Sequence, residues 1–80
     1  MELTPKQHAT RAAIGRNVAS QRALRDRKAE DVAASLGIHR NTLSSYEHGK
    51  TSITVEMLHS IADELGCPVD RLIGVSTGAS

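Results

Sequence analysis

The sequence predicts a small all-α domain built from five helices. Its 80 residues include one tyrosine and neither tryptophan nor phenylalanine, so the core has to be aliphatic. Such a core suits close-packed helices better than a β-sandwich, which normally carries more aromatic and β-branched residues. Apolar residues recur at spacings of three and four, and glycines and capping residues divide the chain into five such stretches.

The first helix is predicted over residues 5 to about 25. Thr4 is a suitable N-cap, Pro5 fits the first helical position, and Gln7 completes a capping box. The inward-facing stripe of this helix ends in a charged residue, because it runs through Ile14, Val18 and Arg22. The arginine therefore needs a partner elsewhere in the fold.

The second and third helices are predicted over residues 29–36 and 40–47. Gly37 separates them and can adopt the left-handed conformation that ends a helix and opens a tight turn. Two helices joined by so short a turn must cross at a steep angle, and the small Ala33 stands where they approach. The apolar positions of this unit are Val32, Leu36, Ile38, Leu43 and Tyr46.

The fourth helix is predicted to begin after the N-cap Thr54 and to end at Gly66, and Pro68 suits the first turn of a short fifth helix. We expect residues 1–75 to form one domain and residues 76–80 to be a frayed tail. The apolar stripes of these two helices are Val55, Leu58, Ile61, Ala62 and Leu65, followed by Val69, Leu72 and Ile73.

The charge is distributed unevenly along the chain. Residues 1–28 hold seven basic and two acidic side chains, a net charge of +5, whereas residues 51–80 hold one basic and four acidic side chains, a net charge of −3. Such an asymmetry is typical of a protein with a basic face for a polyanion. A solvated first helix explains it equally well.

No sequence feature indicates an enzyme or a cofactor. The histidines His8, His39, His48 and His59 lack metal-ligand spacing, and there is no glycine-rich phosphate loop or nucleophile motif. Cys67 is the single cysteine, so no intrachain disulfide can form. The apolar runs are too short for a signal peptide or a membrane span, so we expect a cytoplasmic protein without a membrane partner.

The strongest functional signal lies in residues 29–48. Their apolar spacing, the small Ala33 and the turn glycine Gly37 resemble the helix-turn-helix of the phage-repressor family, also called Cro-type or Xre. The likeness covers residues 14–73 and includes Arg22, Glu47, Gly49, Lys50, Ala62, Leu65, Gly66 and Leu72. It implies a five-helix lambda-repressor-like domain whose second helix lies across the DNA backbone and whose third helix enters the major groove. It also implies a partly buried ion pair between Arg22 and Glu47, whose role is to position the helices.

The outward side chains of the third helix favour DNA binding independently of the resemblance. Arg40 can form a bidentate pair with guanine, Asn41 can do so with adenine, and Ser44 and Ser45 can bond to either base, so we expect base contacts from all four. The resemblance places phosphate contacts at Lys28, Thr42, His48 and Lys50, with Arg16 as a further candidate. His39 either contacts a phosphate or only caps the third helix.

Some positions depart from the family pattern. Lys28 and Ala29 stand where the family often has a serine or threonine cap and a phosphate-binding glutamine, so Asp26 is an alternative cap for the second helix. Gln21 and Arg27 stand where leucine is usual, which affects packing between the first two helices.

The resemblance implies a transcriptional regulator, a repressor or an autoregulator, that binds a double-stranded operator as a homodimer. The operator would be pseudo-palindromic, with half-sites about 34 Å apart. We expect the dimer surface in the C-terminal half, with Met57, Ile73 and Val75 exposed. A phage switch, a restriction-modification controller and an antitoxin-type autorepressor all fit. The alternative is a non-catalytic protein-interaction module that keeps this fold and binds an unidentified protein partner, although the polar third helix favours DNA.

Overall fold

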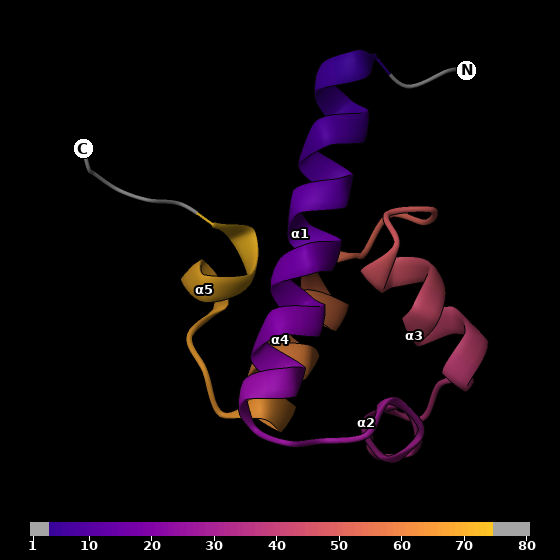
Figure 1. The fold of residues 1–80 in the computed structure, drawn as a ribbon, viewed down its shortest axis with the longest axis vertical. Coiled ribbons are helices and arrows are strands. Elements are labelled where there is room, and N and C mark those ends of the chain that lie inside the picture. Colours follow the sequence, from indigo (N-terminus) through magenta and orange to yellow (C-terminus); the bar gives the residue numbers. More distant parts are fainter. Residues whose placement is uncertain (1–3, 75–80) are drawn as a thin grey trace.

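Five α-helices follow one another in the computed structural model, which describes residues 4–74, and no strand occurs within that range (Figure 1). The predicted all-α fold class is therefore confirmed. The expected frayed tail and Val75 lie outside the described residues. The helices are α1 (Pro5–Leu24), α2 (Ala29–Leu36), α3 (Arg40–Glu47), α4 (Val55–Leu65) and α5 (Val69–Ile73).

The longest helix, α1, is the axis about which the others are arranged. It packs against α3, α4 and α5, while α2 packs against α3 and α4. Figure 1 shows α5 on one side of α1 and α2 and α3 on the other, with α4 behind it. The first turns of α1 rise beyond the other four helices, so the N-terminal half of this helix has few neighbours.

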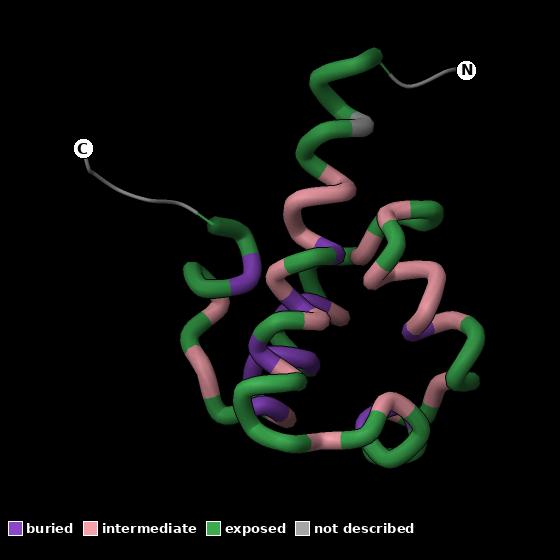
Figure 2. The backbone as a smooth tube through the Cα atoms, in the orientation of Figure 1, coloured by how far each residue is buried: buried purple, intermediate pink, exposed green. Residues whose placement is uncertain are grey.

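Each helix contributes one large, fully buried aliphatic side chain to a single core. Figure 2 marks the buried positions of the chain in purple. Burying such a side chain stabilises the folded state by about 1.5–3 kcal/mol. All five helices are thus tied to one another through the centre, and the aliphatic core expected from the composition is present. These side chains are Val18, Val32, Leu43, Ile61 and Leu72.

Local capping explains where α1 and α4 begin. The Thr4 hydroxyl accepts a hydrogen bond from the Gln7 amide at 3.1 Å, and the Thr4 amide donates to the Gln7 side chain at 2.8 Å, which completes the predicted capping box. At α4 the Thr54 hydroxyl accepts from the Met57 amide at 3.1 Å. These caps satisfy amide donors that a helix start leaves unpaired.

The turn between α2 and α3 depends on glycine for conformational reasons alone. Gly37 has φ of 73°, in the left-handed region, and a Cβ added there would meet no atom within 4 Å. The alternative cap of α2 is wrong: Lys28 is the N-cap and makes no side-chain cap bond. Asp26 instead occupies the preceding turn with φ of 57°, a conformation that aspartate tolerates better than most residues.

Two apolar positions of α4 differ from the prediction. Val55 was expected to face inward but is 68% exposed, because the side chain of a first helical residue points back over the turn before the helix. Met57 was expected to be exposed but is half-buried against the core, because it shares a face with Ile61 and Leu65 one and two turns on. Ile73, which was also expected to be exposed, is 40% exposed.

Polar contacts replace the apolar packing that leucines would give at Gln21 and Arg27. Gln21 is buried, and its side-chain oxygen accepts a hydrogen bond from Arg25 at 2.8 Å. Arg27 forms an ion pair with Glu64 at 2.8 Å and donates to the Glu64 carbonyl at 3.2 Å. The segment before α2 is thereby attached to α4.

The short helix α5 is held against α1. Its N-cap is Pro68, which lies one position before the helix rather than in its first turn. The Asn17 side chain of α1 donates to the Leu72 carbonyl at 2.9 Å, joining residues far apart in the chain. No helix within residues 4–74 has both the length and the apolar character needed to cross a membrane.

Candidate nucleic-acid interface

Helix α3 presents one buried and one polar face. Leu43 is fully buried and Tyr46 is half-buried against the core, which fixes the rotation of the helix. Its start is capped by His39, whose Nδ1 accepts a hydrogen bond from the Asn41 amide at 3.0 Å. Arg40 and Asn41 are exposed on the side away from the core. The first turn of α3 therefore exposes a guanidinium and a side-chain amide to solvent.

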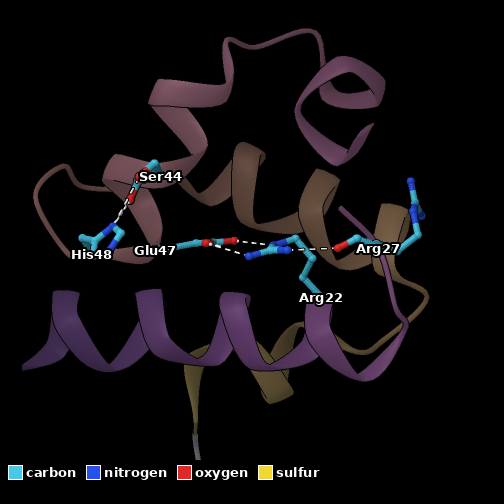
Figure 3. Close-up of polar contacts among 5 residues, drawn as sticks. All are labelled: Arg22, Arg27, Ser44, Glu47 and His48. Carbon is cyan, nitrogen blue, oxygen red and sulfur yellow. Dashed lines mark hydrogen bonds and ion pairs between the residues drawn. The ribbon is translucent and has the colours of Figure 1, made fainter. Parts of the chain in front are cut away.

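The two serines expected on the same face are more covered than Arg40 and Asn41. Ser44 and Ser45 are half-buried. The His48 Nδ1 lies 2.8 Å from the Ser44 carbonyl oxygen and 3.3 Å from the Ser44 hydroxyl (Figure 3). The histidine thus caps the end of α3 while its ring remains exposed.

An acidic side chain of α2 lies within reach of Arg40, which sequence reasoning did not anticipate. The Glu30 carboxylate and the Arg40 guanidinium are 4.0 Å apart, and both side chains are exposed. An exposed pair of this kind is worth about 0.2–1 kcal/mol. The contact orients Arg40 without fixing it.

An ion pair anchors the C-terminal end of α3 to α1 (Figure 3). Arg22 donates to the two carboxylate oxygens of Glu47 at 2.7 and 3.1 Å and to the Arg27 carbonyl at 3.0 Å. The hydrogen bond to Glu47 raises the pKa of Arg22 above its ordinary value. Glu47 is therefore the partner that Arg22 requires at the end of the inward-facing stripe of α1.

A close backbone approach completes this anchor. A Cβ added at Gly15 would lie 2.4 Å from the Tyr46 carbonyl oxygen and 2.6 Å from the Glu47 carbonyl oxygen. A Cβ at Gly49, where φ is 71°, would lie 2.9 Å from the Ala12 Cα. The end of α3 and the turn after it thus rest directly on the backbone of α1. Nothing in the local sequence around Gly15 signals this role.

The remaining candidate residues come from three other segments. Lys28 is the exposed N-cap of α2, Lys50 is exposed in the loop after α3, and Arg16 is exposed on α1 beside Gly15. Thr42 is half-buried on α3. Arg16 makes no hydrogen bond or ion pair with the other candidates in the described part of the chain.

The arrangement offers a polar, partly basic surface. Among the side chains that the structure describes, no group of three or more from histidine, cysteine, aspartate or glutamate is placed to hold a metal ion. In the same residues every buried side-chain nitrogen or oxygen has a hydrogen-bond partner. What remains open to a ligand on α3 is the exposed donor and acceptor set of its first turn.

A family comparison identifies this arrangement. The family model for the helix-turn-helix, of the Xre/Cro type, matches residues 18–72. Among curated proteins, the antitoxin PezA of Streptococcus pneumoniae serotype 4 is 33% identical over 61 residues, which make up 76% of this chain and 39% of the relative. The chain therefore spans about two fifths of that relative's length.

Several solved structures share the fold. The clp gene regulator ClgR of C. glutamicum superposes with a TM-score of 0.77 at 26% identity, covering 80% of this chain and 83% of its own. The restriction-modification controller protein C.AhdI of Aeromonas hydrophila superposes with a TM-score of 0.78 at 18% identity, covering 82% of this chain and 96% of its own. The hypothetical transcription factor NHTF of Neisseria superposes with a TM-score of 0.76 at 22% identity, covering 91% of this chain and 84% of its own.

Proposed function

Because the chain belongs to the Xre/Cro-type helix-turn-helix family of DNA-binding transcription regulators, we propose that it is a sequence-specific regulator that reads double-stranded DNA with α3. One observation carries the proposal: Leu43 is buried on one face of α3 while Arg40 and Asn41 are exposed on the other. A helix with this polarity fits the major groove, which admits one α-helix. The regulators that the chain resembles are not enzymes.

We propose that Arg40 and Asn41 make the principal base contacts. Arginine pairs with two acceptors of guanine and asparagine with an acceptor and a donor of adenine, and both side chains are exposed at the first turn of α3. Ser44 and Ser45 are proposed as further base contacts. Because Ser44 lies beside His48, its hydroxyl has to share its hydrogen bonds with that ring.

The proposed phosphate contacts flank this face. They lie at the start of α2, at and around α3, in the turn after it and on α1, where basic and hydroxyl groups occur. Contacts of this class set the register and the salt dependence of binding without reading sequence. They are Lys28, His39, Thr42, His48, Lys50 and Arg16.

We further propose that residues 1–75 act as one domain that dimerises and binds a pseudo-palindromic operator as a cytoplasmic repressor or autoregulator. A domain of this size reads too few base pairs for genomic specificity on its own, which favours a dimer. The exposed Ile73 supports a dimer surface in the C-terminal half, and α4 adds Val55. ClgR and C.AhdI, with the same fold, are a gene regulator and a controller protein.

A second candidate function is a protein-interaction module with an antitoxin-like role. The identity to PezA favours it, although the chain corresponds to a minor part of that protein. The two functions differ in one measurable property, because a pure interaction module has no preference among duplexes.

The test is duplex binding by wild type and Arg40→Ala on a selected palindrome and on random duplex across a salt series. We expect Arg40→Ala to lose about 1–3 kcal/mol of preference for the palindrome while random binding persists. Arg71→Ala removes an equal charge from the exposed surface of α5 and should leave the preference intact. If wild type fails to bind any duplex at low salt, the regulator proposal fails and a protein partner becomes the leading candidate.

A further inference from the structure

A pocket of about 380 Å³ lies between the N-terminal half of α1 and the loop that joins α3 to α4. Its volume falls within the range of about 300–1,000 Å³ typical of small-molecule sites. The α1 wall includes Lys6, Thr10 and Arg11, and the loop contributes Ser52 and Ile53. This pocket is separate from the exposed face of α3.

The α1 wall of the pocket precedes the part of the chain that matches the helix-turn-helix family model. The match begins at residue 18, whereas the lining residues of α1 lie between 6 and 14. Figure 1 shows that this part of α1 rises beyond the other helices. The α1 wall of the pocket thus lies before the matched residues, whereas the loop wall lies within them.

The lining residues define the chemistry of a ligand. Lys6 and Arg11 supply two positive charges, and no acidic residue lines the pocket or stands in the first turn of α1. Ile14 and Ile53 supply an apolar surface that is continuous with the core. We propose that the pocket binds a small organic carboxylate with a short aliphatic body, its carboxylate toward Lys6 and Arg11 and its chain against the two isoleucines.

The pocket is connected to the proposed DNA-binding surface through Arg11. Its guanidinium donates to the Lys50 carbonyl at 3.4 Å and to the Ser52 hydroxyl. A carboxylate forms stronger charge-assisted hydrogen bonds than these neutral acceptors do, so a bound ligand draws Arg11 away from the loop. Loosening the loop that carries Lys50 weakens duplex binding, a consequence that rests on the proposed function.

The first experiment measures ligand binding alone, by NMR titration of the amide signals with sodium hexanoate at matched ionic strength. We expect saturable shifts at Thr10, Ser52 and Ile53 with millimolar affinity, and about tenfold weaker binding of hexanamide, which lacks the charge. Arg11→Gln should weaken hexanoate binding about tenfold, whereas Arg71→Gln, which removes an exposed charge on α5, should leave it unchanged.

Arg11→Gln also removes the contacts of Arg11 with the loop between α3 and α4, so a second variant tests the pocket without changing those contacts. Thr10→Leu puts a larger apolar side chain into the pocket without removing a charge and should abolish the saturable shifts while the far-ultraviolet circular dichroism remains that of wild type. Shifts that do not saturate, equal affinity for hexanamide, or undiminished binding by Thr10→Leu would each overturn the proposal.

The coupling is tested by duplex binding with and without saturating hexanoate. Wild type should bind the duplex severalfold more weakly in hexanoate, and Thr10→Leu should show no such change. Saturable hexanoate binding with unaltered duplex affinity refutes the coupling. If the protein binds no duplex at all, the proposed function fails, while the titration still decides whether the pocket takes a carboxylate.

Discussion

Replacing Gly15 by alanine sets two effects of opposite sign against each other. Alanine in a helix interior is favoured over glycine by about 1 kcal/mol, so the substitution should stabilise α1. The new methyl group, however, would lie 2.4 Å from the Tyr46 carbonyl oxygen and 2.6 Å from that of Glu47. Both neighbours are backbone atoms, so no flexible side chain can move aside.

The size of the overlap decides which effect prevails. Ordinary contact begins at 3.4 Å, so α3 has to move away from α1 by about 1 Å, an overpacking that typically costs 1–3 kcal/mol. With three backbone atoms of α3 in conflict we take the upper end, which leaves a net destabilisation of about 2 kcal/mol. For a domain of this size the melting temperature should fall by roughly 10 °C.

The assay is urea unfolding followed by circular dichroism, with Ser20→Gly and Ser20→Ala as matched controls. Ser20 is exposed in the interior of the same helix, so the difference between these two variants measures the helix preference without any new contact. If Gly15→Ala stabilises the protein by the amount that separates the two controls, α1 and α3 are not in the contact described here.

Three further predictions concern the packing and ion pairs of α3 and α4. Glu47→Gln replaces the two charged acceptor oxygens of Arg22 with one neutral amide oxygen and should cost about 2–3 kcal/mol in urea unfolding, below the range for a fully buried pair; an unchanged midpoint would contradict the anchoring role. Leu43→Ala should cost about 2–5 kcal/mol in the same assay, since Leu43 is fully buried, and a loss under 1 kcal/mol would argue against its central position. The hydrogen bond from Arg27 holds the pKa of Glu64 below its ordinary value of 4.5. The ion pair therefore stabilises the protein above that pH, and this stabilisation is lost as the pH falls through the lowered pKa of Glu64. Wild type should therefore melt above Glu64→Gln at neutral pH and approach it in acid, and a constant difference across this range would disprove the assignment.

Signals that are local in sequence predicted the helices correctly. The capping box at Thr4, the cap at Thr54 and the turn glycine Gly37 each act within four residues of their own position, so their effect is readable without the fold. The arginine at the end of the α1 stripe was also recognised as needing a partner, because a charge on an inward face is costly alone.

Features that depend on how far one helix extends along another were not predictable. Periodicity places Val55 and Met57 on faces of α4 but does not show how far the neighbouring helices cover each face. The burial of Val55 and the exposure of Met57 were therefore predicted wrongly. The proximity of Gly15 to α3 and the contact of Arg11 with Ser52 join segments distant in sequence. Which residues contact DNA stays a prediction, although the structure already separates the exposed start of α3 from its half-buried serines.

The contact between α1 and α5 bears on how the protein emerges from the ribosome. Helix α1 is synthesised before the other four helices, yet its Asn17 side chain donates to the carbonyl of Leu72, and Leu72 is itself fully buried in the core. A nascent chain that ends after α4 thus lacks Leu72, and α1 meets this last partner only after α5 has been synthesised. Such long-range closure delays completion of the fold and makes it cooperative. The domain should accordingly gain protection from proteolysis in a single late step, after α5 has left the exit tunnel.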